Sequence, residues 1–91
     1  MGRTPRESPR ELTSSWPDVP CDDPAGEIAR QFVLKLVQAT DGQSIRAVAE
    51  KAGVNEGTIR RVIAGESWPD LRTIARVEIS LKKRLYRSSA I

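Results

Sequence analysis

The residues with the clearest chemical use are the arginines of a short helix predicted over residues 56–64. At about 100° per residue, the apolar residues of this helix fall on one side: Ile59, Val62 and Ile63. The opposite side and its flanks carry small or polar residues: Gly57, Thr58, Arg60, Arg61 and Ala64. Arg61 stands there between two residues of minimal bulk. This arrangement suits a helix in the major groove of DNA, because small neighbours allow close approach and arginine reaches a guanine edge bidentately.

Most residue types that serve catalysis and metal binding are missing from the chain. It has no histidine and a single cysteine, Cys21, which excludes histidine acid–base catalysis and His/Cys zinc sites. Isolated carboxylates do not make an active site. We therefore expect a protein that is not an enzyme and that uses no cofactor and no metal. Acidic neighbours disfavour the thiolate of Cys21, so we expect no reactive role for it.

Charge is unevenly distributed over the 91 residues, whose net charge is +3. Residues 1–27 carry three Arg against six acidic residues, whereas residues 28–91 carry twelve Lys and Arg against six acidic residues. The most basic stretch is 71–91, with six basic residues and one acidic residue. A small basic domain is typical of a protein with a polyanionic partner. On charge alone, a surface charged only for solubility is an equally good interpretation.

Membrane and secretion signals are not found in this sequence. No apolar run approaches the roughly 18 residues that suggest a membrane helix. The basic N-terminus is not followed by an apolar segment, as a secretory signal would be. We expect a cytoplasmic protein with neither a membrane partner nor a small-molecule substrate.

A helical repeat of apolar residues begins directly after Pro24. Ile28, Phe32 and Leu36 recur at intervals of four, and Gly42 is the expected stop of this first helix. The alternation typical of strands occurs nowhere. We therefore predict an all-α fold, a small bundle of four helices with five as the alternative count.

Three further helices are predicted, each preceded by a residue suited to an N-cap. The caps and their helices are Ser44 before 45–52, Asn55 before 56–64, and Asp70 before 71–81. The predicted inner face of the last helix is Leu71, Ile74, Ala75, Val77 and Leu81. That helix lacks an obvious stop, so continuation through Tyr86 is the alternative.

The N-terminal residues 1–23 are predicted to form a disordered arm beside a folded domain over 24–91. Five of the six prolines fall within the first 24 residues, where large apolar side chains are few. Such a segment buries too little surface to offset its ordering entropy. Trp16 is the one residue able to overturn this expectation, by docking on the helices.

The joint between the second and third helices combines several geometric requirements. Four residues, 52–55, connect two short helices, which must therefore cross steeply. Ala49 is small where the third helix crosses over it, and Gly53 suits the positive φ that a β-carbon would oppose. Apolar residues are available to fill the corner: Val54, Ile59 and Val62.

With this combination of residues, the stretch 44–65 resembles the helix-turn-helix of the Cro/Xre family of phage and bacterial repressors. The resemblance covers residues 28–81, about 60% of the chain, and includes the segment 68–75 that follows the third helix. It implies sequence-specific binding to duplex DNA by a small homodimeric transcriptional repressor, bacterial or from a phage, that is associated with the nucleoid. The family commonly adds a fifth helix or a dimerisation domain, for which about ten residues remain here.

The resemblance and the helix geometry together lead us to expect two sets of DNA contacts. The expected base contacts are Asn55, Glu56, Gly57 and Arg61. The expected phosphate contacts are Ser44, Arg46, Thr58, Arg60, Ser67, Trp68 and Arg72. Purely structural roles stay open for three of them: Glu56 beside the helix dipole, Ser44 as an N-cap, and Trp68 as a core residue.

Apolar residues left over at the C-terminus are the expected surface of a weak homodimer that DNA favours by mass action: Leu81, Leu85, Tyr86 and Ile91. Within DNA binding, the alternative is an antitoxin-like or excisionase-like accessory factor with the same fold. Outside DNA binding, the alternative is a protein-interaction module in which Trp16 and Trp68 are docking residues.

Overall fold

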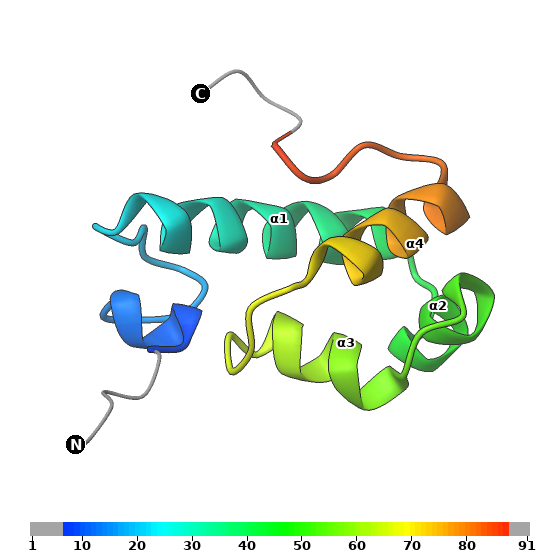
Figure 1. Cartoon of the computed structure of the whole chain (residues 1–91), viewed down its shortest axis with the longest axis horizontal. Helices are drawn as coiled ribbons and strands as arrows, with labels where there is room; N and C mark the ends of the chain where they lie inside the picture. The colour runs from blue at the N-terminus through cyan, green and yellow to red at the C-terminus, as the bar shows by residue number, and fades with distance from the viewer. Residues whose placement is uncertain (1–6, 88–91) are drawn as a thin grey trace.

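The computed structural model describes residues 7–87, in which four α-helices and one short 3-10 helix occur and no strand is present (Figure 1). The elements are η1 (Pro9–Leu12), α1 (Pro24–Thr40), α2 (Ile45–Ala52), α3 (Glu56–Ile63) and α4 (Leu71–Leu81). The prediction of an all-α bundle of four helices is confirmed. Within residues 7–87, no helix combines the length and the apolar character needed to cross a membrane.

Helices α2, α3 and α4 each begin at the polar residue predicted to cap them. The capping side-chain oxygen accepts the backbone N–H three residues on: Ser44 from Ala47, Asn55 from Thr58, and Asp70 from Thr73. A capping interaction of this kind contributes about 1 kcal/mol to a helix. The starts of these helices therefore follow from short local signals in the sequence.

The hydrophobic core lies between α1 and the shorter helices. Helix α2 packs against both α3 and α4, and α1 packs against α3 and η1. The largest buried core side chains are Phe32, Val33, Leu36, Val48, Ile59, Val62 and Val77. Leu85, which follows α4, is also buried in this core. The long helix α1 thus forms one wall, with the helix-turn-helix segment on the other side (Figure 1).

Helix α4 ends at Leu81 and does not continue through Tyr86. Lys82 takes a left-handed conformation with φ of +57°. The Glu78 carboxylate oxygen Oε2 then accepts the backbone N–H groups of Leu85 at 2.7 Å and Tyr86 at 2.8 Å. This side chain holds the returning chain in place, so the helix stops without a glycine. The expected dimer surface is corrected accordingly, because Leu85 belongs to the protein's own core, and Ile91 lies outside the described residues.

The predicted inner face of α4 is only partly correct. Ile74 and Val77 are buried, but Leu71 is 75% exposed and Ala75 is also exposed. Helix α4 packs against α2, and Ile74 and Val77 belong to the buried core. The side of α4 that carries Leu71 and Ala75 is therefore left to solvent. Ile79, also 75% exposed, extends that outer face.

Residues 7–23, called here the N-terminal segment, form an ordered structure against the helices, which corrects the prediction of a disordered arm. Trp16 packs against the hydrophobic core, and its indole Nε1–H donates to the Ile63 carbonyl at 2.9 Å. Pro9 and Cys21 are buried. The segment lies beside α1, with η1 below the N-terminal half of that helix (Figure 1). Residues 1–6 of the predicted arm lie outside the described residues.

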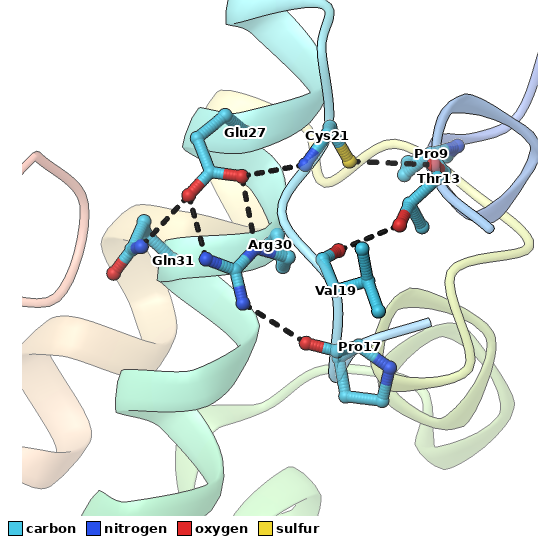
Figure 2. Close-up of polar contacts among 8 residues, drawn as sticks. All are labelled: Pro9, Thr13, Pro17, Val19, Cys21, Glu27, Arg30 and Gln31. Carbon is cyan, nitrogen blue, oxygen red and sulfur yellow. Dashed lines mark hydrogen bonds and ion pairs between the residues drawn. The ribbon is translucent and has the colours of Figure 1, made fainter. Parts of the chain in front are cut away.

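An ion pair on α1 ties the N-terminal segment to that helix, as Figure 2 shows. Arg30 Nη2 lies 2.7 Å from Glu27 Oε2, while Arg30 Nη1 donates to the Pro17 carbonyl at 3.0 Å. Glu27 Oε1 accepts the Cys21 backbone N–H at 2.9 Å, and Gln31 donates to Oε2. The hydrogen bonds from Arg30 hold the pKa of Glu27 at about 2, although partial burial opposes this shift.

Candidate nucleic-acid interface

The corner between α2 and α3 contains the positive φ that was predicted for Gly53. Gly53 lies in the left-handed region with φ of +71°, and its N–H bonds to the Ala49 carbonyl as α2 ends. The Val54 N–H donates to the same carbonyl at 3.0 Å. Arg76 of α4 donates from Nη1 to the Gly53 carbonyl at 2.8 Å, which fixes the corner against a third helix. The two helices are therefore held rigidly relative to each other.

Helix α3 buries the side that its periodicity predicted. Ile59 is 1% exposed and Val62 is 2% exposed, so both anchor the helix in the core. Arg60, Arg61 and Ala64 are exposed. The predicted phase of this helix is confirmed, and Arg61 lies on the outward side.

Gly57 and Arg61, one helical turn apart, form a closely fitted pair on that side. An ideal Cβ placed at Gly57 would lie 3.3 Å from Arg61 Nη1 and 2.9 Å from Asn55 Oδ1. The Arg61 guanidinium therefore lies back along α3, over the space that glycine leaves open. Within residues 7–87, no carboxylate forms an ion pair with Arg61. Its donors are available to an external acceptor.

Glu56 and Arg60 are paired with each other in the first two turns of α3. Arg60 Nη2 lies 2.7 Å from Glu56 Oε2, and Arg60 Nε donates to the same oxygen. Both side chains are well exposed, so the pair contributes at most about 0.5 kcal/mol and opens readily to another partner. Sequence reasoning missed this interaction, although the spacing of four residues with glutamate first is its usual signal.

The remaining predicted contacts lie at the N-terminus of α2, at the N-terminus of α3 and after α3. The side-chain oxygens of Ser44 and Asn55 accept hydrogen bonds as helix caps. The Ser44 hydroxyl hydrogen and the Asn55 side-chain amide hydrogens are left for a ligand. Arg46 and Arg72 are exposed, and Thr58 and Ser67 are half-buried.

Trp68 differs from these residues, because the only hydrogen-bond donor of its side chain is already used within the protein. The indole Nε1–H donates to the Glu7 carbonyl at 2.8 Å, and the ring is half-buried. Beside it, Glu66 forms an ion pair with Arg10 at 3.3 Å. The turn after α3 is therefore held against the N-terminal segment.

The N-terminal segment also covers the end of α3, a feature that sequence reasoning missed. The Arg10 backbone N–H donates to the Gly65 carbonyl at 3.0 Å, and Trp16 donates to Ile63. These bonds satisfy carbonyl groups at the end of a helix that would otherwise lack partners. The signal that could have revealed the contact was Trp16, a large aromatic residue within a polar stretch.

Cys21 lies away from α3, within the N-terminal segment. Burial, followed by the nearby Glu27 carboxylate, raises the pKa of its thiol. The Sγ atom lies 3.9 Å from the Pro9 carbonyl oxygen (Figure 2). Cys21 is therefore a buried, protonated thiol that contributes to packing.

Across residues 7–87, no three acidic, cysteine or histidine side chains gather in a way that could hold a metal ion. Comparison with known proteins finds no matching family model, no matching curated protein and no matching solved structure. The geometry of α2 and α3 is therefore what defines the candidate site.

Proposed function

We propose that this protein binds duplex DNA in a sequence-specific manner, with α3 in the major groove. The observation that carries this proposal is the Gly57–Arg61 pair on the outward side of α3. Its guanidinium has no intramolecular carboxylate partner within residues 7–87, and it lies over Gly57, where a larger side chain would crowd it. Arginine that donates to O6 and N7 of guanine is the commonest specific contact in the major groove.

The proposed contacts fall into two groups with different roles. Base edges are read by Asn55, Glu56, Gly57 and Arg61, with the glycine leaving room for the Arg61 guanidinium. Phosphates are bound by Ser44, Arg46, Thr58, Arg60, Ser67 and Arg72. Phosphate contacts position the helix and make the affinity dependent on salt, while base contacts select the sequence. Trp68 is left out of the second group because its indole N–H is used within the protein.

We also propose that the protein is a small repressor of the Cro/Xre type that acts as a homodimer. The α2–α3 corner supports this type, since it combines Gly53 in a left-handed conformation with a fully buried Ala49. Helix-turn-helix proteins place two such helices on half-sites about 10 base pairs apart. Of the surface expected for the dimer, Tyr86 is exposed in the structure and Leu81 is half-buried.

The alternative function as a protein-interaction module that docks through Trp16 and Trp68 has less support. Both indole N–H groups donate to carbonyls of this same chain. Neither ring is therefore held ready for a partner.

A selection of binding sites from random duplexes, followed by gel-shift titration, tests the proposal. We expect Arg61→Ala to lose preference for the selected site by about 1–3 kcal/mol, while weak non-specific binding persists. The matched control is Arg84→Ala, because Arg84 is also an exposed arginine and lies near Lys35 and Gln38 of α1. An equal loss of specific affinity in both variants would show that only total charge matters. Absence of binding at both low and moderate salt would overturn the proposal.

A further inference from the structure

Three exposed apolar residues follow one another along the outer side of α4. Leu71, Ala75 and Ile79, called here the α4 ridge, recur at intervals of four, and the first and last are each 75% exposed. Single exposed apolar residues are normal on a protein surface, but these three share one stripe about 12 Å long. The buried pair, Ile74 and Val77, already provides the contact of α4 with the core. The ridge therefore has no role in holding this chain together.

The border of the ridge is positively charged. Arg72 lies beside it, and Lys82 and Lys83 follow its C-terminal end, all three exposed. Within residues 7–87, none of these three forms an ion pair with a carboxylate.

The acidic groups nearest to the ridge are already committed to hydrogen bonds within the chain. The Asp70 carboxylate caps α4 by accepting the Thr73 N–H at 2.7 Å. Glu78 Oε2 accepts two backbone N–H groups of the returning chain. Both acids keep their negative charge, and the hydrogen bonds from Thr73, followed by the nearby Arg72, lower the pKa of Asp70. Residues 70–87 still carry six basic residues against these two acids, so this end of the molecule attracts an external anion.

We propose that the α4 ridge docks an acidic amphipathic helix of another protein. A helix with an apolar stripe at intervals of three and four residues can pack its ridge beside Leu71, Ala75 and Ile79. Carboxylates along the flanks of that stripe would meet Arg72, Lys82 and Lys83, and this complementarity selects an acidic partner.

Charge distinguishes this occupant from a second copy of the chain. Two copies that met through the ridge would bring together two surfaces that each carry six basic residues against two acidic residues over 70–87. DNA would satisfy the cations but would leave Leu71 and Ile79 uncovered. Because a stable interface buries about 800 Å² on each partner, a ridge of three residues predicts a weak, salt-sensitive complex. The proposal does not depend on DNA binding by α3, but Arg72 is assigned to both partners, so DNA and the acidic helix would compete for it.

Fluorescence anisotropy with a designed peptide tests the proposal on the full chain. The probe is a labelled helical peptide of about 18 residues, with leucines along one stripe and glutamates on both flanks. We expect it to bind with micromolar affinity at low salt. A peptide with lysine in place of glutamate, and one with serine in place of leucine, should each bind about tenfold more weakly or worse.

Substitutions in the protein then locate the binding surface. We expect Leu71→Ser combined with Ile79→Ser to weaken binding of the glutamate peptide at least about tenfold. The matched control combines Leu34→Ser with Val37→Ser, because these α1 residues are also exposed, at 39% and 48%. The control should bind like the wild type, and circular dichroism should show that both variants stay folded.

Several results would overturn the proposal. One is unchanged binding in the ridge variant, and another is an equal loss in the α1 control. Equal affinity for the lysine peptide would exclude an acidic partner. Self-association that depends on the ridge, measured by sedimentation, would make a second copy the occupant. Ridge-dependent binding to vesicles of phosphatidylglycerol and phosphatidylcholine, without binding to the peptide, would assign the ridge to a lipid surface.

Discussion

The helix-turn-helix of residues 44–64 and the N-terminal segment of residues 7–23 are held in place by different kinds of interaction. In the first, each helix start is capped by a side chain three residues away, and a left-handed glycine makes the corner. In the second, the key bonds join residues 47 and 61 positions apart, from Trp16 to Ile63 and from Trp68 to Glu7. The helix-turn-helix is therefore held by interactions between residues close in sequence, and the N-terminal segment by interactions between residues far apart in sequence.

This difference shows why low apolar content does not by itself imply disorder. The N-terminal segment cannot form a core of its own, but it needs only to cover a surface that the helices already present. Trp16 packs against the hydrophobic core, η1 packs against α1, and the Glu27–Arg30 pair supplies hydrogen bonds to the segment's backbone. The ordering entropy is therefore offset by contacts with residues far away in the sequence.

The largest expected effect comes from removing the anchor of the N-terminal segment. Trp16→Ala should lower the free energy of unfolding by about 3 kcal/mol, because it removes a large aromatic side chain packed against the core. Trp16→Phe keeps a smaller ring there but loses the bond to Ile63 and part of the packed surface, so it should cost less, about 1–2 kcal/mol. Urea denaturation followed by circular dichroism measures both values. A Trp16→Ala variant as stable as the wild type would mean that the segment adds nothing to the fold.

Acid should weaken the same attachment through Glu27. Its pKa is lowered from an ordinary 4.5 to about 2 by the hydrogen bonds from Arg30, so its stabilisation is complete above pH 4.5 and is lost as pH falls toward 2. The shift corresponds to at most about 3 kcal/mol, reduced to about 2 kcal/mol by the solvent that reaches the pair. We expect Glu27→Gln to be less stable at neutral pH and to lose less stability than the wild type between pH 4.5 and 2. Parallel curves for the two proteins over this range would assign the acid sensitivity to other carboxylates.

The smallest effect compares two glycines with similar backbone conformations. Gly42 has φ of +86° with open space around it, whereas a Cβ at Gly65, φ +75°, would lie 2.7 Å from Trp16 Cε2 and 2.8 Å from Arg10 Cβ. Alanine at either position incurs left-handed strain of about 1 kcal/mol. We expect Gly65→Ala to cost about 1 kcal/mol more than Gly42→Ala, because only there must the N-terminal segment shift. Equal melting temperatures for the two variants would contradict a close contact.

The parts of the fold that were predicted from sequence depend on neighbours within one or two helical turns. Ser44, Asn55 and Asp70 cap their helices, and the periodicity of α3 identified its outward side. The order of residues 7–23 was not predictable in this way, because Trp16 becomes an anchor only when the end of α3 is beside it. The end of α4 at Leu81 agrees with the predicted span 71–81, but the stop signal was not predictable, since Glu78 replaces a glycine stop by binding the returning chain.

For the candidate site, the sequence located the exposed arginines but not their partners. The fit of Arg61 over Gly57 and the pairing of Arg60 with Glu56 depend on rotamers that helix periodicity does not specify. The hydrogen bond from the Trp68 indole to the Glu7 carbonyl joins residues 61 positions apart, a separation that no local sequence pattern reveals. The DNA-binding function itself is still a prediction.

The two tryptophans have a consequence for spectroscopy. They are the only two in the chain, and each donates its indole N–H across the boundary between the N-terminal segment and the helices. Trp16 donates from the segment to Ile63 of α3, and Trp68 donates from the turn after α3 to Glu7 of the segment. Their ultraviolet-excited emission is therefore an intrinsic optical reporter of that boundary. Detachment of residues 7–23 should shift this emission to longer wavelength as both indoles enter water. A ligand at the outward side of α3 should alter it only by disturbing the end of that helix.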